Sequence, residues 1–328
     1  MSGPADRTLT DVTPSLAPAA LQAAARGALH PGPDGCGGCA AATLADRPDG
    51  TVVRHGATVA KAHAPDTDAA RLRQRLAVAA APALAGVLLP PLRPEATRLH
   101  GRLVTFWPHG TPVDPDRPQD APWEAAATLL ARLHATPADG LTDAPLPPMR
   151  GPVKAARALA RLDASAPDHP AARPVRRAWR TLPPWARAEA PCDHARALCH
   201  GDLHLGQLVR GPAGPWLLID IDDLGLGDPA WDLARPAAWF ACGLLAPDDW
   251  TRFLTAYRGA GGARQLCAPD PWPALDVPAR ALTVQTAALA VAKAAEAGRS
   301  LDEVEVAVVD ACDRMVGVPA PLGSAAAK

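Results

Sequence analysis

The sequence predicts an α+β protein in which a small β-rich part precedes a larger α-rich part. Residues 40–63 alternate apolar and polar side chains around the Pro48-Asp49-Gly50 turn, as neighbouring strands of an antiparallel sheet do. Residues 66–80 have the apolar period of a helix, which we expect to be inserted after those strands. From Trp123 onward helical periodicity dominates, and short apolar strands interrupt it only between residues 198 and 220.

Composition sets limits on the function. The 328 residues are 48% hydrophobic and 20% charged, enough for a core and for two modest lobes. A net charge of −1 gives no support for a nucleic-acid partner or an anionic membrane surface. No apolar run reaches about 18 residues, so no transmembrane helix is expected, and the first residues lack a secretory pattern. Seven cysteines without a framework spacing predict reduced thiols in a cytoplasm.

The character of the sequence changes near residue 105, which predicts a domain boundary. Before it, a helix pattern occupies the first 29 residues (Leu16, Leu21, Ala24, Leu29), and VLLPPL and RLVTFW are two further extended apolar runs. After it, residues 153–190 are helical and rich in arginine, typical of a solvated face, and the final GSAAAK is expected to be frayed. We expect an N-terminal lobe over residues 1–103, a hinge over 104–110 and a C-terminal lobe over 111–328.

Cys36 and Cys39 form a C-x-x-C pair in the segment CGGC. Zinc would require a second Cys/His pair at a workable spacing, and none is evident in the sequence. A redox pair would lie between a strand and a helix, whereas a Pro/Gly-rich stretch precedes this one. The sequence favours a glycine-bearing loop that holds two thiols.

Residues 199–236, CHGDLHLGQLVRGPAGPWLLIDIDDLGLGDPAWDLARP, carry the most informative pattern. Asp202 lies in a polar turn between apolar residues, Gln207 follows five residues later, and Asp220 closes the strand WLLID. Phosphoryl transfer needs a carboxylate that orients the acceptor hydroxyl and oxygen ligands that hold Mg²⁺ on the phosphates. These three side chains supply that set.

The same segment resembles the aminoglycoside phosphotransferase and choline-kinase-like superfamily, in which H-G-D-x-x-x-x-N is followed by I-D-x-x-x-x-G-x-G-D-P-x-x-D-L-A. The resemblance implies a protein-kinase-like bilobal fold. HGDLHLGQ is similar to the loop of maltokinase-like relatives, in which Gln replaces Asn. The roles implied are catalysis for Asp202, metal binding for Gln207 and Asp220, loop shaping at the nucleotide for His200, and bracing of the loops for Asp228 and Asp232.

The resemblance extends into the first hundred residues. Lys61 in ATVAKAH matches the strand lysine that contacts the α- and β-phosphates. The family's partner for it, a Glu on the following helix, is missing, because Asp66 and Asp68 are the only acids there. The segment VTFWPHG resembles the inter-lobe hinge whose backbone binds adenine, which implies Thr105 and Trp107 as nucleotide contacts.

The sequence therefore predicts a cytoplasmic phosphotransferase that uses ATP and Mg²⁺ and acts on a hydroxyl of a small molecule. An aminoglycoside-type antibiotic and a sugar or amino sugar are the two expected acceptors, and Ser/Thr of a biosynthetic peptide is an alternative. A nucleotide-binding scaffold without phosphotransfer is the alternative of another class, motivated by the missing helix Glu and by Gln207. No nucleic acid or membrane partner is expected.

Overall fold

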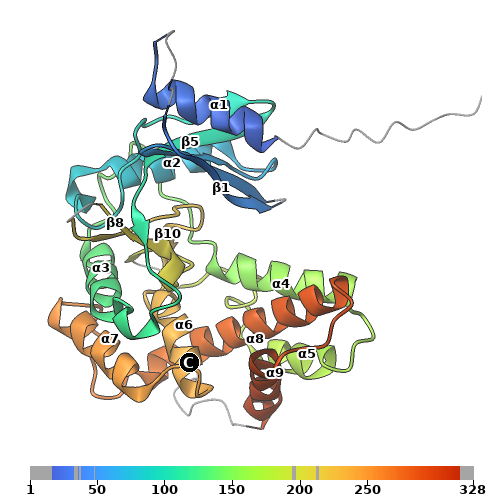
Figure 1. Cartoon of the computed structure of the whole chain (residues 1–328). Helices are drawn as coiled ribbons and strands as arrows, with labels where there is room; N and C mark the ends of the chain where they lie inside the picture. The colour runs from blue at the N-terminus through green and yellow to red at the C-terminus, as the bar shows by residue number, and fades with distance from the viewer. Residues whose placement is uncertain are drawn as a thin grey trace, which may run out of the picture. The chain divides into compact units, whose positions relative to one another are not determined.

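The structure, a computed structural model, describes residues 17–32, 36, 38–47, 49–193, 197–211 and 214–317 (Figure 1). The chain divides into two compact units, each described below by itself. Unit 1 comprises Met1–Arg73 and Pro90–His109, and unit 2 comprises Gln74–Leu89 and Gly110–Lys328. Leu16 of the expected first helix and the expected frayed tail lie outside the described residues. The lobe boundaries expected from the sequence stay a prediction.

Unit 1 contains a five-stranded antiparallel sheet in the order β1-β2-β3-β5-β4. Its strands are β1 (Ala41–Arg47), β2 (Gly50–His55), β3 (Thr58–Ala62), β4 (Thr97–Leu99) and β5 (Arg102–Pro108). The expected strands between residues 40 and 63 and the expected run RLVTFW are thus confirmed. The sequence did not predict β4, whose three residues are too few to display an alternating pattern.

Helix α1 (Pro18–Leu29) packs on this sheet (Figure 1). Leu21 and Ala25 are fully buried on its sheet-facing side. They meet the inward side chains of alternate strand residues, among them Val53 and Ala60, in one small apolar core. The alternation of apolar and polar residues that predicted the strands therefore also determines which face of the sheet α1 covers.

Helix α2 (Ala69–Ala80) crosses the boundary between the two units in the sequence. It begins where the sequence predicts, because the Asp68 carboxylate accepts hydrogen bonds from the backbone N–H of Ala70 (2.8 Å) and Arg71 (3.1 Å). A short 3₁₀ turn, η1 (Pro82–Leu84), follows. The expected extended run VLLPPL forms only one isolated bridge, between Leu88 and Leu218, since the prolines that follow have no N–H for a ladder.

Unit 2 contains two small antiparallel sheets that carry the conspicuous polar loops. One has the order β6-β8-β9, and the other pairs β7 with β10. The strands are β6 (Thr111–Pro112), β7 (Ala197–Cys199), β8 (Leu208–Arg210), β9 (Trp216–Leu218) and β10 (Gly225–Gly227). The loop HGDLHLGQ joins β7 to β8 and includes the 3₁₀ turn η3 (Leu205–Gln207). The expected strands between residues 198 and 220 are therefore present.

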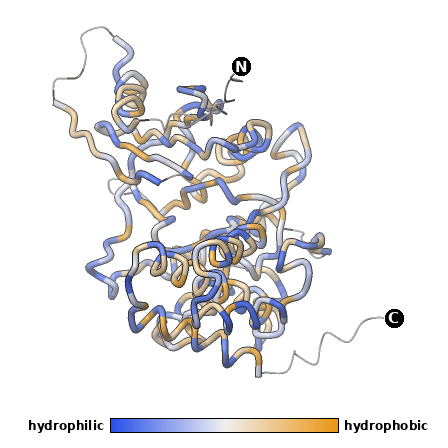
Figure 2. Tube along the Cα trace, turned by 90° about the vertical axis from the view of Figure 1, so that its right-hand side faces the viewer, coloured by the Kyte–Doolittle hydropathy of each residue, from blue (hydrophilic) through white to orange (hydrophobic). Residues whose placement is uncertain are grey.

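Seven α-helices make up most of the described part of unit 2. They are α3 (Trp123–Ala135), α4 (Gly151–Ser165), α5 (Ala172–Thr181), α6 (Ala230–Ala241), α7 (Pro247–Gly259), α8 (Trp272–Glu296) and α9 (Glu303–Val316), with the 3₁₀ turn η2 (Pro118–Asp120) before α3. Helix α8 packs against α4, α6 and α9 around one apolar core. Hydrophobic and hydrophilic residues are interspersed through this part of the chain (Figure 2), but α8 departs from the amphipathic pattern, because residues 281–285 are all buried. Among the described helices, none has the length and apolarity needed to cross a membrane.

The arginine-rich segment expected to be helical consists of α4 and α5. The helix is interrupted at Ala166, which precedes Pro167, because a residue before proline is disfavoured in the helical conformation. Its arginines lie on the outer side, where Arg176 pairs with Asp163 (2.6 Å) and Arg177 with Asp313 (3.4 Å). The prediction of a solvated face is confirmed for these residues.

Gly225 lies where β10 meets the preceding loop, and a side chain there has no room. A Cβ atom would clash with the Pro147 carbonyl oxygen and would come within 2.6 Å of the Pro148 carbonyl carbon. We expect Gly225→Ala to lower the free energy of unfolding by about 1–3 kcal/mol, because backbone atoms must move. Gly259→Ala, at an open helical position, is the control and should change it by less than about 1 kcal/mol. Denaturant unfolding followed by circular dichroism measures both, and equal curves for Gly225→Ala and the wild type would contradict the packing.

Candidate active site

A buried carboxylate holds the loop that contains Asp202. Asp232, on α6, is 1% exposed and accepts hydrogen bonds from the backbone N–H of His200 (2.6 Å) and of Gly201 (2.7 Å). Gly201 has φ +86°, and a Cβ atom there would lie 2.5 Å from the Asp223 carbonyl oxygen. Only glycine fits this turn. The bracing role predicted for Asp232 is therefore confirmed.

A second layer orients Asp232. His134 of α3 lies 3.0 Å from the Asp232 carboxylate through Nε2 and 2.8 Å from the Tyr257 hydroxyl through Nδ1. The Tyr257 oxygen already accepts the backbone N–H of Ala263, so its own proton goes to Nδ1 and His134 carries its proton on Nε2. Burial raises the pKa of Tyr257 well above its ordinary value. Because these polar atoms are satisfied, the grouping of His134, Cys199 and Asp232 is a structural network and not a metal site.

His200 is fully buried and links two loops. Its backbone is held by Asp232, and its Nε2 lies 2.8 Å from the carbonyl oxygen of Ile219, directly before Asp220. The predicted loop-shaping role agrees with this geometry. The side chain has no exposed surface, and a contact of His200 with the nucleotide stays a prediction.

Gln207 and Asp220 are brought close by backbone pairing. The N–H of Ile219 donates to the carbonyl oxygen of Gln207 (2.9 Å), which extends the β8–β9 ladder by one step. Asp220 adopts φ +64°, an uncommon conformation for a residue other than glycine, and its Oδ1 accepts the N–H of Asp222 (3.3 Å). Backbone strain of this kind is concentrated at functional sites. The pair offers a side-chain amide oxygen and a carboxylate, both hard oxygen donors.

Asp202 itself lies between two cations. Its Oδ2 is 2.6 Å from Lys154 Nζ, and its Oδ1 is 2.8 Å from an Arg235 guanidinium nitrogen. Burial alone would raise the pKa of the Asp202 carboxyl, but the charges of Lys154 and Arg235 bring it below its ordinary value. Asp202 is therefore a carboxylate at neutral pH, fixed in one orientation.

Lys154 also contacts a second carboxylate, Asp223 (2.8 Å), which Arg150 approaches at 3.7 Å. Burial would lower the pKa of Lys154, yet Asp223 and Asp202 raise it above the ordinary value, so the lysine stays charged. Burial raises the pKa of Asp223. Asp223 is thus part of the ion-pair network around Asp202.

Sequence reasoning missed Lys154 and Arg235. Arg235 directly follows the DLA motif, but Lys154 lies 48 residues before Asp202 on another helix. One signal was available. The chain has only four lysines among its 33 basic residues, at positions 61, 154, 293 and 328. In a chain that otherwise uses arginine, the few lysines are candidates for places that require a compact ammonium group, although the exposed Lys293 is not such a place.

The predicted nucleotide contacts Lys61, Thr105 and Trp107 lie in unit 1. Lys61 on β3 is half-buried and faces Thr105 of β5 in the ladder. Thr105 is fully buried, and its hydroxyl lies 2.9 Å from both His63 Nε2 and Trp107 Nε1. The indole N–H of Trp107 thus donates a hydrogen bond to the hydroxyl of Thr105, and both side chains are buried.

The backbone of β5 also has a defined direction. The bonds from His63 N–H to Leu103 O and from His109 N–H to Ala57 O fix the alternation of the β3–β5 ladder. In this ladder the backbone N–H and C=O groups of Thr105 and Trp107 point toward β3. Those of Phe106 point away from β3, and its carbonyl oxygen accepts the N–H of Leu92. An adenine base that hydrogen-bonds to the backbone of β5 would therefore meet Phe106 and not Thr105 or Trp107.

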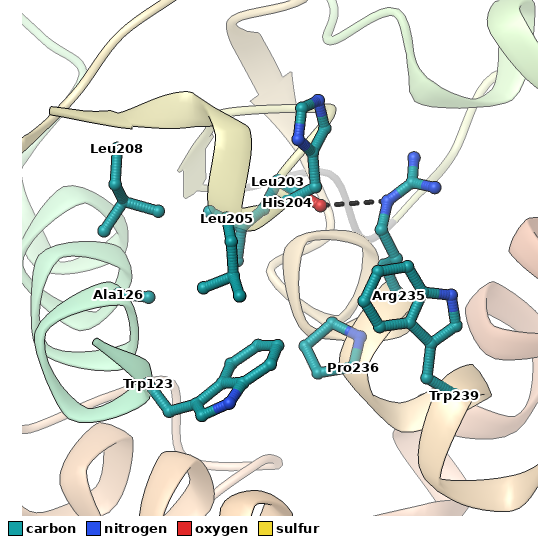
Figure 3. A pocket seen from close by; sticks show the side chains of 9 residues that line it. All are labelled: Trp123, Ala126, Leu203, His204, Leu205, Leu208, Arg235, Pro236 and Trp239. Atoms are coloured by element: carbon teal, nitrogen blue, oxygen red, sulfur yellow. Dashed lines mark hydrogen bonds between the residues drawn. The ribbon is translucent and has the colours of Figure 1, made fainter. Parts of the chain in front are cut away.

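A small pocket in unit 2 adjoins the Asp202 loop (Figure 3). The side chains of Trp123, Leu205 and Pro236 point toward one another around it, and the Arg235 Nε donates to the carbonyl oxygen of Leu203 at 3.0 Å. The full lining is Trp123, Ala126, Leu203, His204, Leu205, Leu208, Arg235, Pro236 and Trp239. These described lining residues include two tryptophans, one arginine and one histidine but no acid.

Comparison with known proteins agrees with this geometry. A model of the phosphotransferase enzyme family (APH) matches residues 50–276, well over half of the chain. No curated protein sequence matches the chain.

Several solved structures share the fold. They include a choline/ethanolamine kinase family protein from Mesorhizobium loti (19% identity, covering 90% of this chain and 94% of that one, TM-score 0.55). Choline kinase LicA from Streptococcus pneumoniae is similar as well (14% identity, 85% and 93%, TM-score 0.55). So is a thermostable mutant of aminoglycoside phosphotransferase APH(4)-Ia in complex with AMP-PNP and hygromycin B (15% identity, 86% and 95%, TM-score 0.56). The expected kinase-like α+β fold is confirmed.

The Asp232 brace generates a prediction about stability. In Asp232→Asn the amide NH₂ replaces one accepting oxygen and faces an N–H donor, so we expect a loss of about 1–3 kcal/mol in the free energy of unfolding. Asp313→Asn, whose side chain is 63% exposed, is the matched control and should change it by less than about 0.5 kcal/mol. If both variants unfold alike in urea, Asp232 does not hold the loop.

Proposed function

Because the chain belongs to the phosphotransferase enzyme family, we propose that it is an ATP-dependent kinase of a small-molecule hydroxyl and that Asp202 is its catalytic carboxylate. The observation that carries this proposal is the setting of Asp202, which follows directly on the braced residues His200 and Gly201 and lies between Lys154 and Arg235. A side chain held this firmly can orient an acceptor hydroxyl.

In the proposed reaction Asp202 accepts a hydrogen bond from the acceptor hydroxyl and aligns its oxygen with the phosphorus. Each carboxylate oxygen keeps a lone pair beside its ion pair, so the hydroxyl can be bound without displacing Lys154 or Arg235. The lowered pKa makes Asp202 a weak base. Its contribution is thus mainly positioning. It takes the proton as the new oxygen–phosphorus bond forms and the bond from the γ-phosphorus to the bridging oxygen of ATP breaks, which releases ADP, in keeping with a loose phosphoryl transition state.

Gln207 and Asp220 are the proposed Mg²⁺ ligands. Their donor atoms fit the ion, because Mg²⁺ prefers oxygen ligands and the two residues lie on paired backbones. When bound with ATP, Mg²⁺ neutralises charge on the β- and γ-phosphates. The chain's own part is to hold the backbone of Asp220 in its left-handed conformation and to pair the backbone of the buried Gln207 with that of Ile219, the residue before Asp220.

The nucleotide contacts are proposed in a revised form. Lys61 keeps the role of phosphate contact. His200 becomes a positioning residue, because it is buried. Contact of the base with the β5 backbone is proposed for Phe106 and not for Thr105 or Trp107, whose backbone groups face β3.

The charges around Asp202 favour one class of acceptor. The neighbouring small pocket has room for only about one water molecule, so it does not hold the acceptor itself. Lys154 and Arg235 already pair with the two carboxylate oxygens of Asp202. A polycation brought to Asp202 would meet these two cations, whereas a neutral sugar can present a hydroxyl there without that repulsion. We therefore propose a sugar-like acceptor ahead of an aminoglycoside or a peptide. A cytoplasmic location belongs to the same proposal.

An acceptor screen with Asp202→Asn tests the proposed function. ATP consumption with Mg²⁺ is measured over neutral sugars, amino sugars, aminoglycosides and Ser/Thr peptides. We expect turnover with a sugar-like compound, and a loss of several orders of magnitude in kcat for Asp202→Asn with nucleotide binding retained. Asp313→Asn should behave as the wild type. Turnover with aminoglycosides alone would contradict the acceptor class, and no ATP consumption with any acceptor would favour the scaffold without phosphotransfer.

A pH profile tests the role of Lys154. Removing its charge in Lys154→Met should raise the pKa of Asp202, so the acid limb of the kcat/KM profile should move to higher pH. Lys293→Met, at an exposed site on α8, should leave the limb in place. If Lys154→Met lowers activity equally at every pH, Lys154 does not set the ionisation of Asp202.

A further inference from the structure

Four metal-binding side chains from three separate segments of unit 1 converge. His30 follows the end of α1, Cys36 and Cys39 lie in the loop between α1 and β1, and His55 ends β2. One ligand atom from each residue lies within 4.8 Å of all the others. The second Cys/His pair that the sequence analysis did not find is therefore present. Strand pairing brings it there, since Ala41 is the ladder partner of His55.

The separations suit a tetrahedral metal. Zn–S bonds of about 2.3 Å and Zn–N bonds of about 2.0–2.1 Å give ligand-to-ligand distances of roughly 3.3–3.8 Å at a tetrahedral angle. The Sγ of Cys39 is already 3.4 Å from His30 Nε2, and the rings of His30 and His55 meet edge to face with centroids 5.8 Å apart. Contraction of the remaining distances by about an ångström needs only small rotations of side chains.

Three further observations support a metal ion bound by this cluster. His55 is 8% exposed, and its Nε2 is buried without a hydrogen-bond partner among the described residues. The backbone N–H of Cys39 donates to the Sγ of Cys36 (3.1 Å), which favours the thiolate that a metal requires. Gly56 has φ +57°, and a Cβ atom there would lie 3.1 Å from the Cys39 sulfur, so the loop packs directly on the hairpin turn.

We propose that His30, Cys36, Cys39 and His55 form a structural Zn²⁺ site. Two thiolates and two imidazoles are a donor set typical of closed, four-coordinate zinc, and two thiolates balance the charge of the ion. Sulfur and nitrogen donors suit Mg²⁺ poorly, so the site is chemically distinct from the oxygen donors Gln207 and Asp220 of unit 2. With all four positions filled by protein, the zinc has no open position for catalysis.

The proposed role is to join the end of α1 and the following loop to the β2–β3 hairpin. Helix α1 otherwise contacts the sheet through a small apolar face that includes Leu21 and Ala25. The zinc would fix the C-terminal end of α1 beside Gly56, where the Leu29 side chain already packs so closely that a Cβ atom on the glycine would lie 2.9 Å from it. It would act on the stability of unit 1 and not on phosphoryl transfer.

Zinc content of the full chain tests the proposal without any activity assay. Protein expressed with added Zn²⁺, purified reduced and dialysed, should contain about one zinc per chain by mass spectrometry of the metal. Replacement by Co²⁺ should give the visible and thiolate charge-transfer absorption of a tetrahedral Cys₂His₂ complex. Cys36→Ser and His55→Asn should each weaken Zn²⁺ binding more than about 100-fold, since losing a ligand costs more than the 10–100-fold of an outer-shell change.

Matched controls separate the site from general thiol or histidine chemistry. Cys267→Ser and His100→Asn change residues outside the cluster, and both should keep the full zinc content. A chelator should lower the unfolding temperature of the wild type but not that of Cys36→Ser. His30→Asn, at a half-buried position, serves as a second ligand variant if Cys36→Ser does not fold. A disulfide between Cys36 and Cys39 in the purified protein, or equal zinc in the wild type and the ligand variants, would overturn the proposal.

Discussion

The site depends on one buried charge, the carboxylate of Asp232. A charge removed from water is tolerated only when hydrogen bonds replace its hydration, and here they come from the backbone of His200 and Gly201 and from His134. Two of these donors belong to the loop that contains Asp202. The third belongs to α3, and through Tyr257 the network reaches α7. Through this single side chain, the packing of α3, α6 and α7 fixes the position of the loop.

Around Asp202 the charges are arranged as a balanced group. Two carboxylates, Asp202 and Asp223, share Lys154, and Arg235 completes the set on the other side. Partial burial strengthens each of these interactions relative to water. It also makes removal of any one member costly, because its partner would remain as an uncompensated buried charge. The geometry of the Asp202 carboxylate is thus a property of the group and not of the loop alone.

The sequence predicted those features that local spacing encodes. Alternation located the strands of unit 1, Asp68 marked the start of α2, and the HGD and GDPAWDLA segments identified Asp202 and its brace. What it missed depends on contacts between distant segments. Lys154 reaches Asp202 only because the residues just before α4 pair with β10, and His55 meets Cys39 only through the β1–β2 register. The burial of His200 could not be predicted for the same reason, since burial is decided by tertiary packing.

The origin of Lys154 on α4 has a dynamic consequence. Lys154, which pairs with Asp202, lies on α4. This helix is held in place by its packing against α8 and by the exposed ion pair of Arg161 with Glu296. Proteins open locally before they unfold as a whole. Any partial detachment of α4 would withdraw the ammonium group while the loop itself stayed folded. On warming, the protein would lose activity at a lower temperature than that at which it unfolds as a whole. The difference between the two temperatures would measure the local stability of the packing of α4.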